Sequence, residues 1–273
     1  MQDPSRQFSF SDLLKMTKSG PTNVQKSLKE LKSLFICKKD GTRTLYQLNS
    51  RNYLVKSLFI TYAWEKVQFF PAKVVSCLGA LVDNSQYAVS IYLFGSAVYS
   101  KSPNDFDVAV IYDGNKTKLE SIWKDIRTDF QENVEVHFFS KKDFIMMFNE
   151  GNYRLTSTLK GCLVLHDRNF IFQYLGKKSQ SEPDFLLKEI NTLQVKVKKC
   201  FTLYRDDKEK CLELQKNIWL DFLRVYIAAK GNIPGSRHQL EKQANKLGLS
   251  LMKRDLWESL EWMEKILREI KNI

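Results

Sequence analysis

Residues 89–112 constrain the fold most, because two apolar runs, each typical of a buried strand, flank a short polar segment there. Gly95 and Ser96 follow the first run directly, and Asp105 and Asp107 lead into the second. Side chains alternate along a strand, so the two aspartates are expected to share one face. The pattern predicts a strand, a tight bend, a loop and a second strand that begins with paired carboxylates.

These polar residues favour a site for a cation and a phosphate group. Two carboxylates so close together repel each other unless a cation lies between them, and Mg²⁺ prefers oxygen ligands and substrate phosphates. Gly95 lets the backbone approach a ligand closely, and the hydroxyl of Ser96 with nearby amides can hold phosphate oxygens.

A third carboxylate is expected nearby. Residues 133–139 form another alternating pattern, in which Glu135 stands between Val134 and Val136. An acidic residue between β-branched residues of a strand is out of place unless its carboxylate faces a partner group. Three carboxylates on adjacent strands can hold two metal ions. His137 would share the face of Glu135, and we interpret it as a hydrogen-bonded structural histidine.

The order Gly95–Ser96, Asp105-x-Asp107 and Glu135, each on a strand, resembles the DNA polymerase β nucleotidyltransferase superfamily, and within it the minimal nucleotidyltransferases of bacteria and archaea. The resemblance implies that Gly95 and Ser96 bind the phosphates of a nucleotide. It also implies that Asp105, Asp107 and Glu135 are catalytic and hold the metal.

The implied cofactor is Mg²⁺, as two ions, with Mn²⁺ as an alternative, and the implied substrate is an NTP, ATP first. Eight residues separate Ser96 from Asp105, slightly fewer than the family usually has. Lys101 is the only cation in that loop and is a candidate nucleotide-binding residue.

The first 52 residues resemble a winged helix-turn-helix domain. After a break at residues 19–22, a helix over residues 23–35 is expected to bury Val24, Leu28, Leu31 and Phe35. Two partly alternating runs flank Asp40-Gly41, which predicts a hairpin. By this resemblance, the helix would read DNA and the hairpin would touch its backbone. The residues implied in nucleic-acid binding are Asn23, Gln25, Lys26, Lys29, Lys38, Lys39 and Arg43.

The expected fold class is α+β, with a mixed-sheet nucleotidyltransferase core between the winged helix and a helical bundle. Residues 53–180 are assigned to the core, with 53–88 as connecting helices. Residues 181–273 are helical throughout and resemble the HEPN-type or substrate-binding bundles that accompany minimal nucleotidyltransferases, mostly through residues 228–240. We expect the bundle to position an acceptor or dock a protein partner.

Charge separates the chain into basic, neutral and basic parts within a total of +12. Residues 1–60 carry eleven Lys and Arg against four Asp and Glu, and residues 183–273 carry eighteen against thirteen. This layout suits contact with a polyanion. The five scattered cysteines indicate no disulfide framework, and no apolar stretch reaches the ~18 residues of a membrane span. A cytoplasmic protein without a membrane segment is therefore expected.

Two functions follow from the resemblance. The first is transfer of a nucleoside monophosphate to an acceptor hydroxyl on an RNA or tRNA end, a protein side chain or a small molecule, with release of pyrophosphate. A toxin–antitoxin or phage-defence role fits the basic flanks by family analogy. The alternative is a DNA-binding transcriptional regulator whose core senses nucleotide without transfer.

Overall fold

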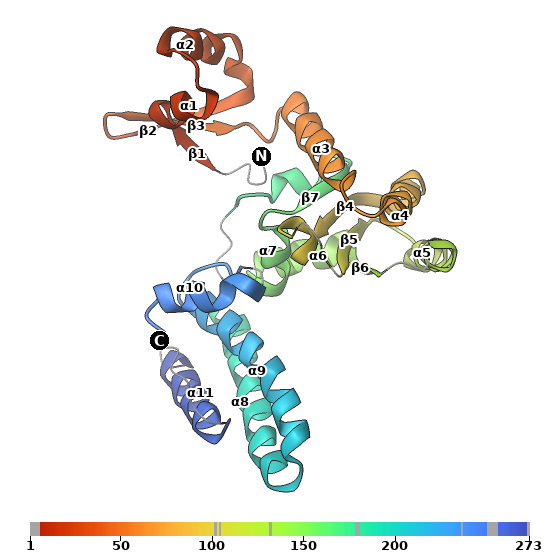
Figure 1. The fold of residues 1–273 in the computed structure, drawn as a ribbon, viewed down its shortest axis with the longest axis vertical. Coiled ribbons are helices and arrows are strands. Elements are labelled where there is room, and N and C mark those ends of the chain that lie inside the picture. The colour runs from red at the N-terminus through yellow and green to blue at the C-terminus, as the bar shows by residue number, and fades with distance from the viewer. Residues whose placement is uncertain are drawn as a thin grey trace. The chain divides into compact units, whose positions relative to one another are not determined.

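The computed structural model describes residues 6–100, 103, 105–130, 133–177, 181–235, 237–249 and 256–271 (Figure 1). The chain divides into two compact units, which we call the first and the second unit. The first consists of Met1–Asp143 and Thr158–Lys177, and the second of Phe144–Ser157 and Lys178–Ile273.

Each unit is made of two separate segments of the chain, whereas the expected division places a single boundary at residue 180. The expected core domain spans residues 53–180, and residues 144–157 within that range fall in the second unit. Tyr153 explains this, since its ring is buried in the core of that unit. Its hydroxyl also donates a hydrogen bond of 2.7 Å to Glu189, which is a residue of that unit.

Residues 6–50 build a small α+β substructure, which we call the head. Its antiparallel sheet has the order β1-β3-β2. Its elements are β1 (Gln7–Ser9), α1 (Phe10–Thr17), α2 (Pro21–Glu30), η1 (Lys32–Leu34), β2 (Phe35–Asp40) and β3 (Arg43–Leu48). Two helices followed by a hairpin agree with the expected element order, and the winged helix-turn-helix identity stays a prediction.

Helix α2 ends earlier than expected. It begins at Pro21, where the fixed φ of proline suits the first helical turn, and it ends at Glu30. The predicted stripe to residue 35 is wrong, because Phe35 pairs with Leu48 as the first residue of β2. Leu31 is 45% exposed instead of buried. The hairpin turn consists of the two residues between Asp40 and Arg43, one position later than expected.

A mixed four-stranded sheet forms the centre of the first unit. Its order is β6-β5-β4-β7, with β5 and β6 parallel and the other neighbours antiparallel. The strands are β4 (Ala88–Phe94), β5 (Phe106–Tyr112), β6 (Val134–Ser140) and β7 (Leu163–Asp167). This sheet confirms the predicted α+β class and the four strands read from the sequence.

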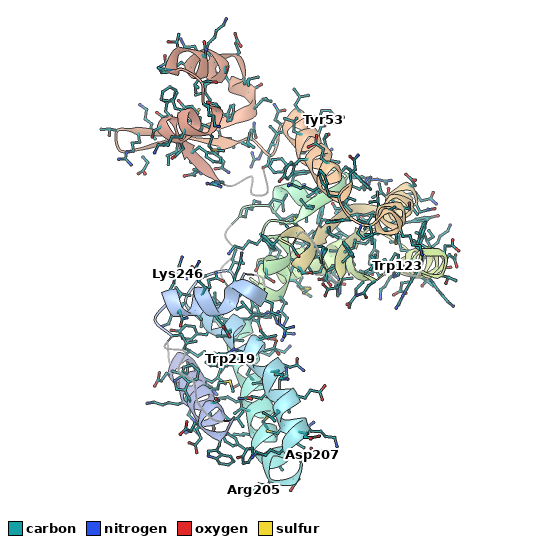
Figure 2. All side chains as sticks on the ribbon, in the orientation of Figure 1. Tyr53, Trp123, Arg205, Asp207, Trp219 and Lys246 are labelled. Carbon is teal, nitrogen blue, oxygen red and sulfur yellow. The ribbon has the colours of Figure 1, made fainter. Side chains whose placement is uncertain are left out.

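One face of the sheet packs against helices α3 (Tyr53–Val67), α4 (Ala72–Asp83) and α5 (Lys116–Phe130). Val108 and Val110 of β5 meet Leu78 of α4 and Trp123 of α5 in one buried cluster, and Figure 2 labels Trp123. Burial of this apolar face leaves the alternate residues of the same strands on the opposite face.

Ser90 of β4 supports the sheet with a buried polar contact. Its hydroxyl donates a hydrogen bond of 2.5 Å to Asp167 Oδ1 on β7, and Ser90 is fully buried. Ser90→Ala is expected to lower the free energy of unfolding by about 1–3 kcal/mol, because the partly buried carboxylate of Asp167 loses a donor. Urea unfolding measures the change. Ser121→Ala, on the exposed side of α5, is the control, and an equally small effect of both variants would contradict this role.

The second unit is helical. Its core joins α8 and α9 with the last two helices through residues such as Val197, Phe222, Leu240 and Leu260. Asp207 separates α8 from α9 and accepts a hydrogen bond from the amide of Lys210 (Figure 2). The elements are α6 (Lys141–Asn149) and α7 (Tyr153–Leu159), which cross the boundary between the units, α8 (Pro183–Asp206), α9 (Lys208–Ala229), η5 (Arg237–Gln239), α10 (Leu240–Lys246) and α11 (Leu256–Lys271).

Among the helices of the described residues, none has the length and apolar character needed to cross a lipid bilayer.

Candidate active site

Two of the predicted acids lie side by side on the parallel strands β5 and β6. Asp107 is in register with Glu135, so their side chains leave the sheet on the same face. Phe106 and Val108, the neighbours of Asp107, are buried on the opposite face. The apolar packing of β5 therefore directs the Asp107 carboxylate away from the helices, toward Glu135.

His137 completes a group of three side chains. Its Nε2 atom lies 3.8 Å from Asp107 Oδ1 and 3.7 Å from Glu135 Oε1. One ligand atom from each residue lies within 4.8 Å of the other two. We call Asp107, Glu135 and His137 the acid–histidine group.

The charges in this group act on one another. The Asp107 carboxylate is the main cause that raises the pKa of His137 above its ordinary value, and the charge of Glu135 adds to it. Partial burial of the imidazole opposes this rise in pKa. The side chain of Glu135 is 73% exposed and that of Asp107 only 23%. The group is therefore open to solvent on the side of Glu135, and Asp107 is its less exposed carboxylate.

Phe94 forms an aromatic side to the group. It is the last residue of β4 and pairs with Asp107 across the antiparallel ladder. Its ring centroid lies 5.5 Å from that of His137, at an interplanar angle of 50°. This contact restricts the imidazole ring and leaves its Nε2 beside the two carboxylates.

Gly95 brings the backbone directly against Asp107. Its φ is +73°, a conformation that other residues rarely adopt. A Cβ atom on Gly95 would overlap Asp107 Oδ2 and lie 3.2 Å from Asp107 Cγ. Only glycine therefore allows this close approach, and the same residue starts the 3₁₀ turn η3 (Gly95–Val98).

Ser96 and Asp105 contact each other beside this bend. The Ser96 hydroxyl donates a hydrogen bond of 2.7 Å to Asp105 Oδ1 and contacts the Asp105 carbonyl at 3.5 Å. Asp105 lies just before β5 and is exposed. Among the described residues, it is outside the acid–histidine group. Its expected role as a metal ligand stays a prediction, and its observed contact is with the bend.

From the sequence we interpret His137 as a structural histidine in preference to one that touches substrate, and one candidate site residue lies outside the described residues. Lys101, the expected phosphate-binding cation, is that candidate. The signal for His137 was present in its position two residues after Glu135 on an alternating strand. The distances show that His137 lies beside both carboxylates, a contact that the interpretation from the sequence did not include.

The predicted nucleic-acid contacts lie on two elements of the head. Helix α2 buries Val24 and exposes the opposite side. The hairpin of β2 and β3 carries the others near its turn. All seven predicted residues are exposed: Asn23, Gln25, Lys26, Lys29, Lys38, Lys39 and Arg43.

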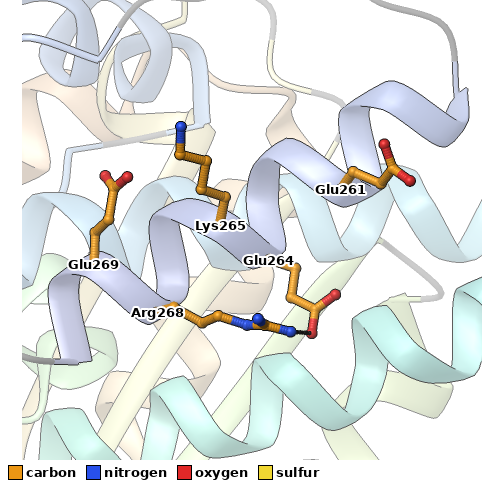
Figure 3. A pocket seen from close by; sticks show the side chains of 5 residues that line it. All are labelled: Glu261, Glu264, Lys265, Arg268 and Glu269. Atoms are coloured by element: carbon orange, nitrogen blue, oxygen red, sulfur yellow. Dashed lines mark hydrogen bonds and ion pairs between the residues drawn. The ribbon is translucent and has the colours of Figure 1, made fainter.

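A pocket of the second unit is distinct from these residues. It is lined by charged side chains of the single helix α11, and Arg268 forms an ion pair of 2.8 Å with Glu264 there (Figure 3). Three acids and two bases make up this lining, so it does not concentrate one charge as the acid–histidine group does. The lining residues are Glu261, Glu264, Lys265, Arg268 and Glu269.

Comparison with known proteins gives little similarity. No family model matches the chain, and no curated protein is significantly similar in sequence. The solved structure of a nucleotidyltransferase-like protein from Exiguobacterium sibiricum aligns with 71% of this chain and 74% of its own. The identity is 12% and the TM-score 0.35, too low to establish a common fold. We therefore base the assignment below on the residues of this chain.

Proposed function

We propose that the protein is a metal-dependent nucleotidyltransferase, which moves a nucleoside monophosphate from an NTP to an acceptor hydroxyl and releases pyrophosphate. The observation that supports this most is the position of the acid–histidine group directly beside the positive-φ bend at Gly95. A cation site and a close approach of the backbone are the two elements that binding of a triphosphate requires.

The residues present fit a divalent metal. Asp107 and Glu135 offer carboxylate oxygens, which suit Mg²⁺ or Mn²⁺, and His137 offers a nitrogen within the same group. The bound ion would neutralise charge on the phosphates and lower the pKa of an attacking hydroxyl. The set of three acids implied by the resemblance would add Asp105, and we propose that Asp105 acts at the bend through Ser96.

Residues around the metal site would bind the phosphates and accept the proton of the acceptor. The backbone at Gly95 would hold phosphate oxygens. The single proton of the Ser96 hydroxyl is donated to Asp105, so this hydroxyl would turn from Asp105 to a phosphate oxygen when the NTP binds. Glu135 is the most exposed member of the acid–histidine group, so it can accept the proton of an acceptor hydroxyl that arrives from solvent. Phe94 and Asp107 would keep the imidazole of His137 in place.

The test is incubation of the protein with α-labelled NTPs, Mg²⁺, total RNA and cell lysate. Label is expected in RNA or in protein, and which of them takes it identifies the acceptor class. The variant Asp105→Ala with Asp107→Ala is expected to transfer none. Equal labelling by wild type and double variant, or no pyrophosphate release with any acceptor, would overturn the proposed function.

We also propose that the head binds nucleic acid, since all seven predicted contact residues are exposed on α2 and the hairpin. A toxin–antitoxin or defence role, and a protein partner at the helical bundle, belong to the same proposal. In the alternative function, the head regulates transcription and the core senses nucleotide, so duplex binding would occur without pyrophosphate release.

Salt dependence of duplex binding tests the head separately. Replacing Lys26, Lys29, Lys39 and Arg43 by Ala is expected to reduce the slope of log K against log salt by roughly 0.9 for each phosphate contact removed. Fluorescence anisotropy with a labelled duplex measures it. Replacement of four exposed lysines of the second unit, Lys198, Lys199, Lys208 and Lys216, is the matched control. An unchanged slope in the head variant would contradict nucleic-acid binding by these residues.

A further inference from the structure

Tyr99 links the end of the bend to another part of the first unit. It follows η3 directly, and its hydroxyl donates a hydrogen bond of 2.6 Å to the carbonyl of Lys160. Lys160 lies three residues before β7, far from Tyr99 in the sequence. Tyr99 is 45% exposed, so water could satisfy its hydroxyl without a protein partner. The hydrogen bond therefore points to a function in fixing one segment against the other.

The residue after Lys160 is a glycine, which leaves room for the Tyr99 ring. Gly161 has a φ of +75°, and a Cβ atom there would lie 2.6 Å from the Tyr99 hydroxyl oxygen and 3.3 Å from Cζ. A side chain at this position would displace the tyrosine ring. The contact thus depends on the conformation of Gly161 as well as on the hydroxyl of Tyr99.

Displacement of Tyr99 would be transmitted to Ser96. The amide of Tyr99 donates to the Ser96 carbonyl at 3.1 Å, and the amide of Ser100 donates to it at 2.9 Å. The same serine contacts Asp105 through its hydroxyl. The segment that receives Tyr99 is itself attached to β4, because Tyr92 and Thr158 share a hydrogen bond of 2.9 Å.

We propose that Tyr99 is a positioning residue that holds the bend at Gly95 and Ser96 in the conformation that receives the phosphates of the NTP. It acts through the backbone and does not touch the reacting atoms. The nucleotide part of this inference rests on the proposed function, whereas the fixing of the bend does not.

Amide hydrogen exchange and nucleotide kinetics test the two parts together. Tyr99→Phe removes only the hydroxyl, and loss of one hydrogen bond is expected to speed exchange of residues 96–100 by about three- to tenfold. KM for the NTP is expected to rise by a similar factor, with kcat nearly unchanged. Gly161→Ala removes the contact from the other side and is expected to give the same two changes.

Tyr87→Phe is the matched control, since Tyr87 precedes β4 and its ring contacts Lys118. It is expected to leave both quantities at their wild-type values. Unchanged exchange in Tyr99→Phe and Gly161→Ala would overturn the fixing of the bend. Faster exchange with an unchanged KM would overturn the positioning of nucleotide. Wild-type protein that transfers no label with any NTP would overturn the proposed function, while the exchange result would still decide whether Tyr99 holds the bend.

Discussion

Asp107→Asn is expected to lower the rate of nucleotidyl transfer by at least about 10³-fold. Asp107 has the least exposed side chain of the acid–histidine group, with Glu135 and His137 both beside it. The amide keeps the size of the side chain and removes its negative charge, so the cation loses a ligand and the developing phosphate charge loses its counterion. A metal contributes several kcal/mol to such a barrier, which corresponds to this factor. Single-turnover transfer of label at saturating Mg²⁺ measures the rate.

Asp113→Asn is the matched control for this variant. Asp113 follows the same strand at its other end, and its carboxylate forms an exposed ion pair of 3.1 Å with Lys141. Exposed ion pairs contribute little, so the transfer rate is expected to change less than about twofold. If Asp107→Asn transferred label as fast as Asp113→Asn, Asp107 would not be a catalytic residue.

Gly95→Ala is expected to abolish NTP binding and to lower the free energy of unfolding by about 1–3 kcal/mol. The methyl group would overlap Asp107 Oδ2, and alanine is strained at a φ of +73°. Either the bend or the Asp107 carboxylate must then move, so the two parts of the site separate. Urea unfolding and equilibrium binding of a labelled NTP measure the two effects.

Gly79→Ala, at a second glycine of the same unit, is the control variant and is expected to change stability in the opposite direction. Apart from its two chain neighbours and the nearby backbone of α4 itself, no atom lies within 4 Å of the Cβ position at Gly79, which is inside α4. Alanine is the better helix former by about 0.8–1 kcal/mol, so stability is expected to rise and NTP binding to stay unchanged. A Gly95→Ala variant that binds NTP like Gly79→Ala would show that the close approach at Gly95 has no part in the site.

The strands of the central sheet could be predicted because their apolar residues form short continuous runs. The runs before Gly95 and after Asp105 are buried on both sides, and the acids stand at their ends. Alternation also predicts which face of its own strand each of Asp107 and Glu135 occupies. Which strands become neighbours depends on the whole sheet, so the register of β5 with β6 required the structure.

Other features of the fold and the site depend on contacts between distant residues, which the periodicity of the sequence does not predict. The helical pattern over residues 23–35 predicted burial of Phe35 in a helix. In the structure Phe35 pairs with Leu48 and is the first residue of β2. Tyr153 joins the second unit through its buried ring and its bond to Glu189, so the domain boundary could not be placed by composition. His137 follows the strand pattern of a structural residue, and only the distances to Asp107 and Glu135 distinguish it.

Titration with Mn²⁺, followed by electron paramagnetic resonance of the free ion, tests the central claim most directly. The claim is that Asp107, Glu135 and His137 form a cation site beside the Gly95 bend. Wild-type protein and Asp113→Asn are expected to bind Mn²⁺ with equal affinity, and Asp107→Asn and Glu135→Gln are expected to lose that binding. Equal Mn²⁺ binding by all four proteins, or none by the wild type, would contradict the claim.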